Sequence, residues 1–300
     1  MNKSKKLMQI KDLFRLFIKI INSSSNDQRK LDPEIFAFEN ILGYPIIFTD
    51  KHDLKYILYP GQNAQVYFQN NGNYELAETN YCLKEIKKGM TVFDIGANIG
   101  LYSLLFAKLV SETGTVHAFE PDYKNFRRLV TNIYINGFET IVKPHNKAVF
   151  SKTQKVKLNT FPDSVNSWHT MGNLTLPNPW VPGKTISPIL VQEIQAISIN
   201  DYCHENNIER IDFLKVDVEG AELDVFEGAS KLFRLGKINK VLFEISLPQI
   251  QSMSHKPEDI FHFFKKYFYN IYRIQKDGSI SNNLNNTDEV CINYVAIRKN

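Results

Sequence analysis

The sequence has few cysteines, no long apolar run and no excess of basic residues outside its first segment. Its three cysteines, Cys82, Cys203 and Cys291, lie far apart and match neither a zinc-binding spacing nor an even disulfide framework. We therefore expect reduced, buried thiols. Because no run of about 18 apolar residues occurs, no membrane-spanning helix is expected. An apolar share of 43% is ample for a core, which excludes global disorder. A globular cytoplasmic protein is the class that remains.

The basic residues are concentrated at the N-terminus. Residues 1–21 carry six basic residues against one acidic residue, whereas the rest of the chain has 30 basic against 31 acidic residues. The body therefore lacks the basic patch of a nucleic-acid-binding protein, and we expect no nucleic-acid partner. Apolar residues recur at helical spacing within residues 1–21, which predicts a basic amphipathic helix. Two interpretations stay open: the helix docks on protein, or it lies peripherally on the anionic inner surface of a membrane.

The chain divides into three predicted parts. Residues 1–30 are the basic amphipathic helix and a polar linker, and residues 31–89 are an N-terminal region with mixed strand and helix signals. From residue 90 to residue 300 strands and helices alternate, which is typical of an α/β fold with a parallel sheet. The patterns predict helices at residues 74–88 and 221–235, a third strand at 140–143 that residues 145–149 continue, and an added edge strand at 156–158. Residues 159–188 interrupt this alternation and contain both tryptophans of the chain. Long loops without regular structure are usually functional, so we interpret this segment as an insertion that serves a site.

One segment combines a strand, a glycine turn and the start of a helix. In residues 92–100 (VFDIGANIG) apolar residues surround Asp94, and Gly96 and Gly100 follow. Glycine lets the backbone turn sharply, and a helix N-terminus offers unpaired N–H groups to a ligand. A second apolar run ends in Glu120, whose carboxylate can accept hydrogen bonds from ribose hydroxyls. The unit predicts a site for an adenosine-containing cofactor.

The turn does not fit a dinucleotide. The dinucleotide fingerprint G-x-G-x-x-G, counted from Gly96, meets Asn98 and Leu101 at its second and third glycine positions. Asn98 would crowd a pyrophosphate, and a charged Asp94 would repel it. A carboxylate at the turn instead suits the amino group and sulfonium of S-adenosylmethionine. The residues predicted to bind this cofactor are Asp94, Gly96, Ala97, Asn98, Gly100, Glu120 and Asp217.

Three further acidic residues belong to later strand patterns. Asp217 directly follows the apolar run 211–216, Glu219 lies two residues on, and Glu244 sits in the next strand. In open α/β sheets ligands bind at the carboxyl ends of the strands. A carboxylate beside a buried strand is normally paired or used, because its desolvation is costly. Asp217 and Glu219 therefore either cap the next helix or contact a reacting centre. Lys215 is the residue expected to pair with Asp217 and hold it ionised.

Four segments, in the same order and spacing, resemble the FkbM family of S-adenosylmethionine-dependent methyltransferases. They are residues 92–102 (VFDIGANIGLY), 118–122 (AFEPD), 211–222 (IDFLKVDVEGAE) and 242–245 (LFEI), and the turn at 72–75 is similar too. The resemblance implies a class I methyltransferase fold, which is Rossmann-like, with a seven-stranded, mostly parallel α/β sheet whose last strand is antiparallel. An N-terminal extension precedes it here. The resemblance also implies O-methylation, commonly of sugars in glycans or polysaccharides, or of natural products.

These observations predict an O-methyltransferase that acts on a hydroxyl of a sugar. Asp217 and Glu219 are the predicted catalytic residues. The predicted acceptor contacts are Trp168 and His169, in the 159–188 insertion, and Glu244. A tryptophan face can stack on a sugar ring, and polar neighbours can bind its hydroxyls. Methyl transfer itself needs mainly alignment of the acceptor with the S–CH3 bond, together with a base when the acceptor is a hydroxyl.

Alternatives remain at this stage. His145, His169 and His255 are other candidates for the base. Asp217 and Glu219 could offer oxygen ligands to a divalent ion in a metal-assisted methyltransferase of a small metabolite, although we predict no resident metal. A non-catalytic cofactor-binding module with the same fold is a third interpretation. The sequence does not indicate an oligomeric state.

Overall fold

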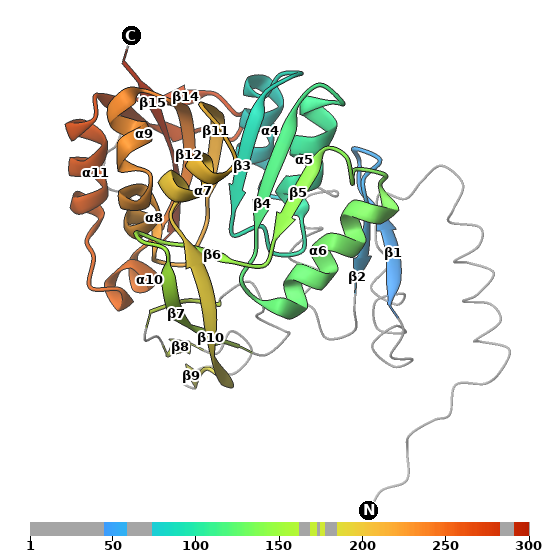
Figure 1. Cartoon of the computed structure of the whole chain (residues 1–300), viewed down its shortest axis with the longest axis horizontal. Helices are drawn as coiled ribbons and strands as arrows, with labels where there is room; N and C mark the ends of the chain where they lie inside the picture. Colours follow the sequence, from blue (N-terminus) through green and yellow to red (C-terminus); the bar gives the residue numbers. More distant parts are fainter. Residues whose placement is uncertain are drawn as a thin grey trace, which may run out of the picture.

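The computed structural model describes residues 45–58, 74–161, 169–172, 175–177, 185–282 and 291–299 (Figure 1). The amphipathic segment 1–21 and its linker lie outside these ranges, as does the predicted acceptor contact Trp168. None of the helices within the described ranges is long and apolar enough to span a lipid bilayer.

An eight-stranded sheet forms the centre of the fold. Its strands are β3 (Thr91–Ile95), β4 (Thr115–Phe119), β5 (Val142–His145), β11 (Ile211–Val216), β12 (Ile238–Ser246), β13 (Tyr269–Ile274), β14 (Ile280–Ser281) and β15 (Cys291–Arg298). They lie in the order β14-β13-β15-β12-β11-β3-β4-β5. Strands β5, β4, β3, β11 and β12 pair in parallel, and β15 runs antiparallel between β12 and β13. With the two-residue edge strand β14 set aside, this is the predicted class I methyltransferase sheet with its last strand antiparallel.

Helices cover both faces of the sheet (Figure 1). Helices α4 (Leu76–Glu85), α5 (Leu101–Val110) and α6 (Tyr123–Ile135) pack on one face, and α7 (Ile199–Glu205), α8 (Glu222–Gly228), α9 (Ser230–Leu235) and α11 (Pro257–Lys266) on the other. The alternation of side chains along each strand divides the core: Val92 belongs to the first cluster, and Phe93 and Ile95 to the second. All three side chains are fully buried, so β3 lies at the centre of both layers.

Several helix boundaries differ from the predicted ones. The helix predicted at residues 74–88 is the shorter α4, and the helix predicted at 221–235 is divided into α8 and α9 at Ala229. At Gly228, which precedes the division, an added Cβ would lie 2.2 Å from the carbonyl oxygen of Phe150, so this glycine allows a close backbone approach. A further helix, α10 (Leu247–Ser252), was not predicted. Cys82 and Cys203 are buried as expected, whereas Cys291 is exposed, and that expectation was wrong.

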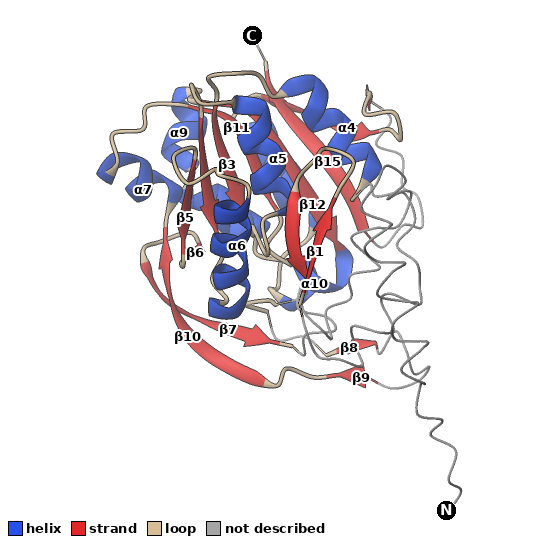
Figure 2. Ribbon diagram, turned by 90° about the vertical axis from the view of Figure 1, so that its right-hand side faces the viewer, coloured by secondary structure: helices blue, strands red, loops and turns tan. Residues whose placement is uncertain are grey.

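A second, three-stranded sheet lies beside the first. It consists of β6 (Ala148–Val149), β10 (Leu190–Ile197) and β7 (Gln154–Thr160), in that order, and Figure 2 shows β7 and β10 curving below the main sheet. Residues 145–149 were predicted to continue the third strand of the main sheet, but β5 ends at His145 and β6 pairs with β10. The edge strand predicted at 156–158 likewise belongs to this second sheet. Residues 159–160 are part of β7, so the irregular segment begins later than predicted.

The described part of the N-terminal region packs on helix α6 and on the hydrophobic cluster around β3 and α5. A hairpin of β1 (Ile46–Thr49) and β2 (Lys55–Leu58) binds α6, because the backbone N–H of Ile57 donates to the Asn132 side chain at 2.8 Å. Helix α4 contributes Tyr81 and Cys82 to the same hydrophobic cluster as β3 and α5.

Candidate active site

The glycine turn after β3 brings two strand ends into contact. Gly96 has a φ of 84°, and a Cβ on it would lie 1.8 Å from the carbonyl oxygen of Asp217. The space that glycine leaves is therefore filled by the backbone at the end of β11. Gly100, with a φ of 97°, begins α5, and a Cβ there would meet the Leu129 side chain at 2.8 Å. Both positions require glycine for the fold of the site itself.

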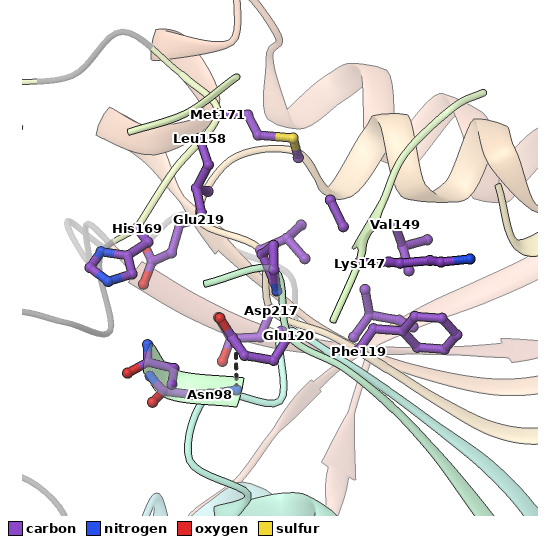
Figure 3. A pocket seen from close by; sticks show the side chains of 16 residues that line it. Asn98, Phe119, Glu120, Lys147, Val149, Leu158, His169, Met171, Asp217 and Glu219 are labelled. Carbon is purple, nitrogen blue, oxygen red and sulfur yellow. Dashed lines mark hydrogen bonds between the residues drawn. The ribbon is translucent and has the colours of Figure 1, made fainter. Parts of the chain in front are cut away.

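Glu120 lies at the end of β4 and faces the turn. Its Oε2 accepts a hydrogen bond from the backbone N–H of Asn98 at 2.8 Å (Figure 3), and its Oε1 accepts one from the N–H of Asp122 at 2.9 Å. Only 5% of Glu120 is exposed. Burial raises the pKa of Glu120 to about 8, even though the two backbone hydrogen bonds lower it. The carboxyl is thus held in place before any ligand arrives.

A cavity of about 540 Å³, part of it open to solvent, lies at the carboxyl ends of β3, β4 and β11. Figure 3 shows Glu120 and Asp217 near its centre, with Glu219 and His169 toward one end and Phe119 and Lys147 toward the other. The predicted site residues that line the cavity are Gly96, Asn98, Glu120, His169, Asp217 and Glu219. The structure does not place Asp94, Ala97, Gly100 or Glu244 in its wall.

Asp94 is fully buried behind the turn. Its Oδ2 accepts a hydrogen bond from the Ser103 hydroxyl at 2.6 Å, while its Oδ1 has no hydrogen-bond partner. Burial raises the pKa of Asp94, and Lys215 and Ser103 oppose this increase. The side-chain oxygen of Asn98, a residue with a φ of 50°, is also buried and unpartnered. Such orphaned acceptors are costly in a finished site, which indicates that a donor group binds here.

A buried lysine organises the end of β11. The Nζ of Lys215 lies 2.9 Å from Oδ2 of Asp217, and only 5% of Lys215 is exposed. The ammonium also lies 4.5 Å from the centre of the Tyr102 ring. Burial alone would lower the pKa of Lys215, but Asp217 and Asp94 raise it above its usual value. The predicted pairing of Lys215 with Asp217 is therefore present.

Glu222, which was not predicted as a site residue, binds the loop after β11. Glu222 accepts hydrogen bonds through Oε1 from the backbone N–H groups of Val218 and Gly220, both at 3.2 Å. Helix α8 has no other side-chain cap, so Glu222, and not Asp217 or Glu219, satisfies these amides. Burial raises the pKa of Glu219 well above its usual value, and Glu244 and Asp217 raise it further.

Glu75 is a second functional candidate that was missed. It precedes α4 with a φ of 40°, and its Oε2 accepts a hydrogen bond from the Tyr102 hydroxyl at 2.6 Å. Burial and the nearby Asp217 raise the pKa of Glu75 to about 7, against the effect of Lys215. Burial and Asp217 also raise the pKa of Glu244, to about 8. The turn at residues 72–75 was a signal for Glu75, but no chemistry could be assigned to it from sequence.

Comparison with known proteins decides the family. The methyltransferase FkbM domain model matches residues 94–271 of the chain. The chain belongs to the FkbM methyltransferase family. This family depends on S-adenosylmethionine, so the predicted family and the predicted cofactor are confirmed.

The relatives of this FkbM-family protein are named as methyltransferases. The 31-O-demethyl-FK506 methyltransferase FkbM of Streptomyces tacrolimicus is 30% identical over 163 residues, which are 48% of this chain and 61% of that protein. The hexuronic acid methyltransferase AglP of Haloferax volcanii is 27% identical over 166 residues, covering 54% of this chain and 59% of the relative. The chain thus spans about three fifths of the length of these curated relatives. Among solved structures, methyltransferase FkbM from Methylobacillus flagellatus KT is 16% identical with a TM-score of 0.42, and the match covers 71% of this chain and 44% of that one.

The residues of the FkbM-family site fit S-adenosylmethionine. Glu120 lies at the centre of the cavity, and its two carboxyl oxygens, each with one hydrogen bond from a backbone N–H, can accept further hydrogen bonds from ribose hydroxyls. Oδ1 of Asp94 and the side-chain oxygen of Asn98 are acceptors without a partner, and an ammonium donor would satisfy such acceptors. Glu120 would hold the ribose, and Asp94 and Asn98 the amino-acid end.

Two of the three candidate histidine bases lie outside the cavity wall. His145 Nε2 and His117 Nδ1 lie 2.7 and 2.8 Å from the Tyr202 hydroxyl. Burial lowers the pKa of both histidines to about 4, so they are neutral. His255 Nε2 pairs with Asp224 at 2.8 Å. Of the three candidates, only His169 lines the cavity.

The metal-assisted alternative has little support in the described geometry. Across the residues that the structure describes, no three histidine, cysteine or acidic side chains are grouped so that they could hold a metal ion. One oxygen of Asp217 is already engaged by Lys215.

Proposed function

We propose that this protein is an S-adenosylmethionine-dependent O-methyltransferase that modifies a hydroxyl of a sugar in a glycan, a polysaccharide or a glycosylated small molecule. The observation that carries the proposal is the shared cavity: Glu120 lines it together with Asp217, Glu219 and His169. One end suits the adenosine of the cofactor and the other suits a polar acceptor beside ionisable groups.

The roles of the residues follow from their positions. When bound, S-adenosylmethionine supplies an activated methyl group. Asp217, paired with Lys215, accepts a hydrogen bond from the acceptor hydroxyl and aligns its oxygen. Alignment alone accounts for about 7–11 kcal/mol in well-oriented reactions. The ionised form of Glu219 takes up the hydroxyl proton, and burial, which raises the pKa of this carboxyl, makes that form a stronger base.

A sugar acceptor is supported by chemistry and by one relative. Carboxylates are acceptors only, and sugars present many hydroxyl donors to them. The name of AglP, a hexuronic acid methyltransferase, points to a sugar for that relative. Stacking of the sugar on Trp168 remains a prediction, as does hydrogen bonding to His169 and Glu244.

The test is transfer of a labelled methyl group. Purified full-length protein is incubated with methyl-labelled S-adenosylmethionine and cell glycan fractions, and the products are identified by mass spectrometry. We expect label on a sugar oxygen, and none with the Asp217→Asn variant. Label on a non-sugar metabolite that disappears with excess chelator would support the metal-assisted alternative. Cofactor binding without transfer to any fraction would support a binding module.

Peripheral membrane contact through residues 1–21 is also a proposal. The segment carries six basic residues against one acidic residue, and anionic lipid attracts such a segment. Sedimentation with anionic and with neutral vesicles tests it. Binding only to anionic vesicles is expected, and no binding to either would favour docking on protein.

A further inference from the structure

A short piece of the insertion, residues 169–172, is fastened to β7. The backbone N–H of Asn159 donates to the Thr170 carbonyl at 2.8 Å, and the N–H of Thr170 donates back at 3.2 Å. The Asn159 side-chain amide donates to the Gly172 carbonyl at 2.8 Å. Three hydrogen bonds therefore fix this piece, which carries His169 at the cavity wall.

The Thr170 hydroxyl reaches from this piece to the loop after β11. Its Oγ1 donates to the backbone carbonyl of Glu219 at 2.6 Å and accepts from the N–H of Gly172 at 3.0 Å. Thr170 is only 1% exposed, so water cannot easily replace either bond. The single hydroxyl proton of Thr170 is committed to Glu219.

The bond acts on a strained position. Glu219 has a φ of 54°, in the left-handed region that a residue with a side chain rarely adopts. Glu222 binds the amides of Val218 and Gly220 but not the carbonyl between them. The peptide plane that follows Glu219 is therefore held at both ends, by Thr170 at its carbonyl and by Glu222 at the Gly220 N–H.

Helix α10 packs against both residues 169–172 and the loop after β11. A Cβ on Gly172 would lie 1.9 Å from the Ser252 hydroxyl, and a Cβ on Gly220 would lie 2.3 Å from the Gln249 carbonyl oxygen. The Ser252 hydroxyl in turn donates to that same carbonyl at 2.6 Å. The insertion and the loop after β11 thus pack side by side on one helix (Figure 3 shows His169, Met171 and Glu219 along the same wall).

We propose that Thr170 is a positioning residue: it holds the Glu219 carbonyl so that the Glu219 carboxyl points into the cavity. Through this hydrogen bond, Thr170 couples the insertion to the chemistry at that carboxyl. The proposal rests on the proposed function for the role of Glu219. The bond itself is independent of that function.

The experiment compares three threonine variants of the full-length protein. Thr170→Val removes the hydroxyl at nearly constant shape, and Thr170→Ser keeps it. Thr160→Val is the matched control: Thr160 is 5% exposed and donates to the Leu190 carbonyl at 3.1 Å, within the second sheet and outside the cavity wall. We expect Thr170→Val to lower kcat about tenfold with unchanged cofactor affinity, the size of one lost positioning hydrogen bond. Thr170→Ser and Thr160→Val should stay within about twofold of the wild type.

A double-mutant cycle separates positioning from general packing. In the Glu219→Gln background, Thr170→Val should lower kcat no further. The same tenfold loss in both backgrounds, or an equal loss in Thr160→Val, would overturn the proposal.

Crystal structures of the variants test the proposal without an acceptor substrate. The backbone of Glu219 should leave its left-handed conformation in Thr170→Val and keep it in Thr170→Ser. An unchanged Glu219 in Thr170→Val would refute the inference. If the wild type methylates nothing, the proposed function fails, while these structures still decide the role of Thr170.

Discussion

Binding of the nucleoside should depend on pH through Glu120. Burial raises the pKa of this carboxyl to about 8 in the protein without ligand. Ribose hydroxyls donate hydrogen bonds and so favour the ionised carboxylate. The ligand therefore binds best to the form that predominates above pH 8, and binding below that pH releases a proton.

The size of the pH effect on ligand binding follows from the fraction of Glu120 that is ionised. With a pKa of about 8, about one Glu120 in ten is ionised at pH 7. Each pH unit below 8 should weaken binding by about tenfold, or about 1.4 kcal/mol, until the pKa of the complex is reached. Above pH 8 the affinity should level off.

Calorimetry with 5′-methylthioadenosine measures this effect. This ligand carries the ribose but not the titratable amino-acid end of the cofactor, so Glu120 is isolated as the source of pH dependence. Titrations at pH 6.5 to 9 in two buffers of different ionisation enthalpy should reveal release of nearly one proton at pH 7. The Glu120→Gln variant should bind about 1–3 kcal/mol more weakly and independently of pH. A wild-type affinity that stays constant from pH 6.5 to 9 would refute the assignment of Glu120 to the ribose.

Three further outcomes are expected. Asp217→Asn should keep the fold and lower turnover at least about 100-fold, measured by steady-state kinetics; a folded, fully active variant would remove Asp217 from the chemistry. Gly96→Ala should lower the free energy of unfolding in urea by more than about 2 kcal/mol, because its Cβ would lie 1.8 Å from the Asp217 carbonyl; Gly137→Ala, with a similar φ of 70° and no atom within 4 Å, is the control and should cost less. The free energy of unfolding should also fall as the pH drops from 6.5 toward 4, because His117 stays neutral in the fold while the unfolded chain takes up the proton; a urea series at pH 7.5 and pH 5 that is unchanged by His117→Gln would contradict this.

The sequence predicted the cofactor half of the site because its signals are local. The strand, glycine turn and helix around Gly96 follow one another without a break, and Glu120 ends the next strand. The pairing of Lys215 with Asp217 was also predictable, since the two residues lie on the same side of one strand end. Apolar periodicity was sufficient for the alternation of parallel strands and helices in the main sheet.

The parts of the fold and of the site that were not predicted depend on contacts between segments far apart in the sequence. Gly96 was assigned to ligand approach, whereas its open side is filled by the carbonyl of Asp217, a residue far along the chain. Strands β7 and β10 pair across the irregular insertion, so no short-range pattern indicates their register. Glu75 owes its raised pKa to burial and to Asp217, and neither can be read from its neighbours in sequence.

The position of Glu75 has a consequence for engineering. The family match begins at residue 94, yet the Glu75 carboxyl lies in the preceding region, where it accepts a hydrogen bond from Tyr102 and interacts electrostatically with Asp217. A chimera that exchanges residues 45–89 between two family members would therefore keep the Gly96 turn and Glu120 but replace one acidic group that acts on Asp217. Such exchanges offer a route to new acceptor preferences, and a protein trimmed to residues 94–271 would lose that acidic group altogether.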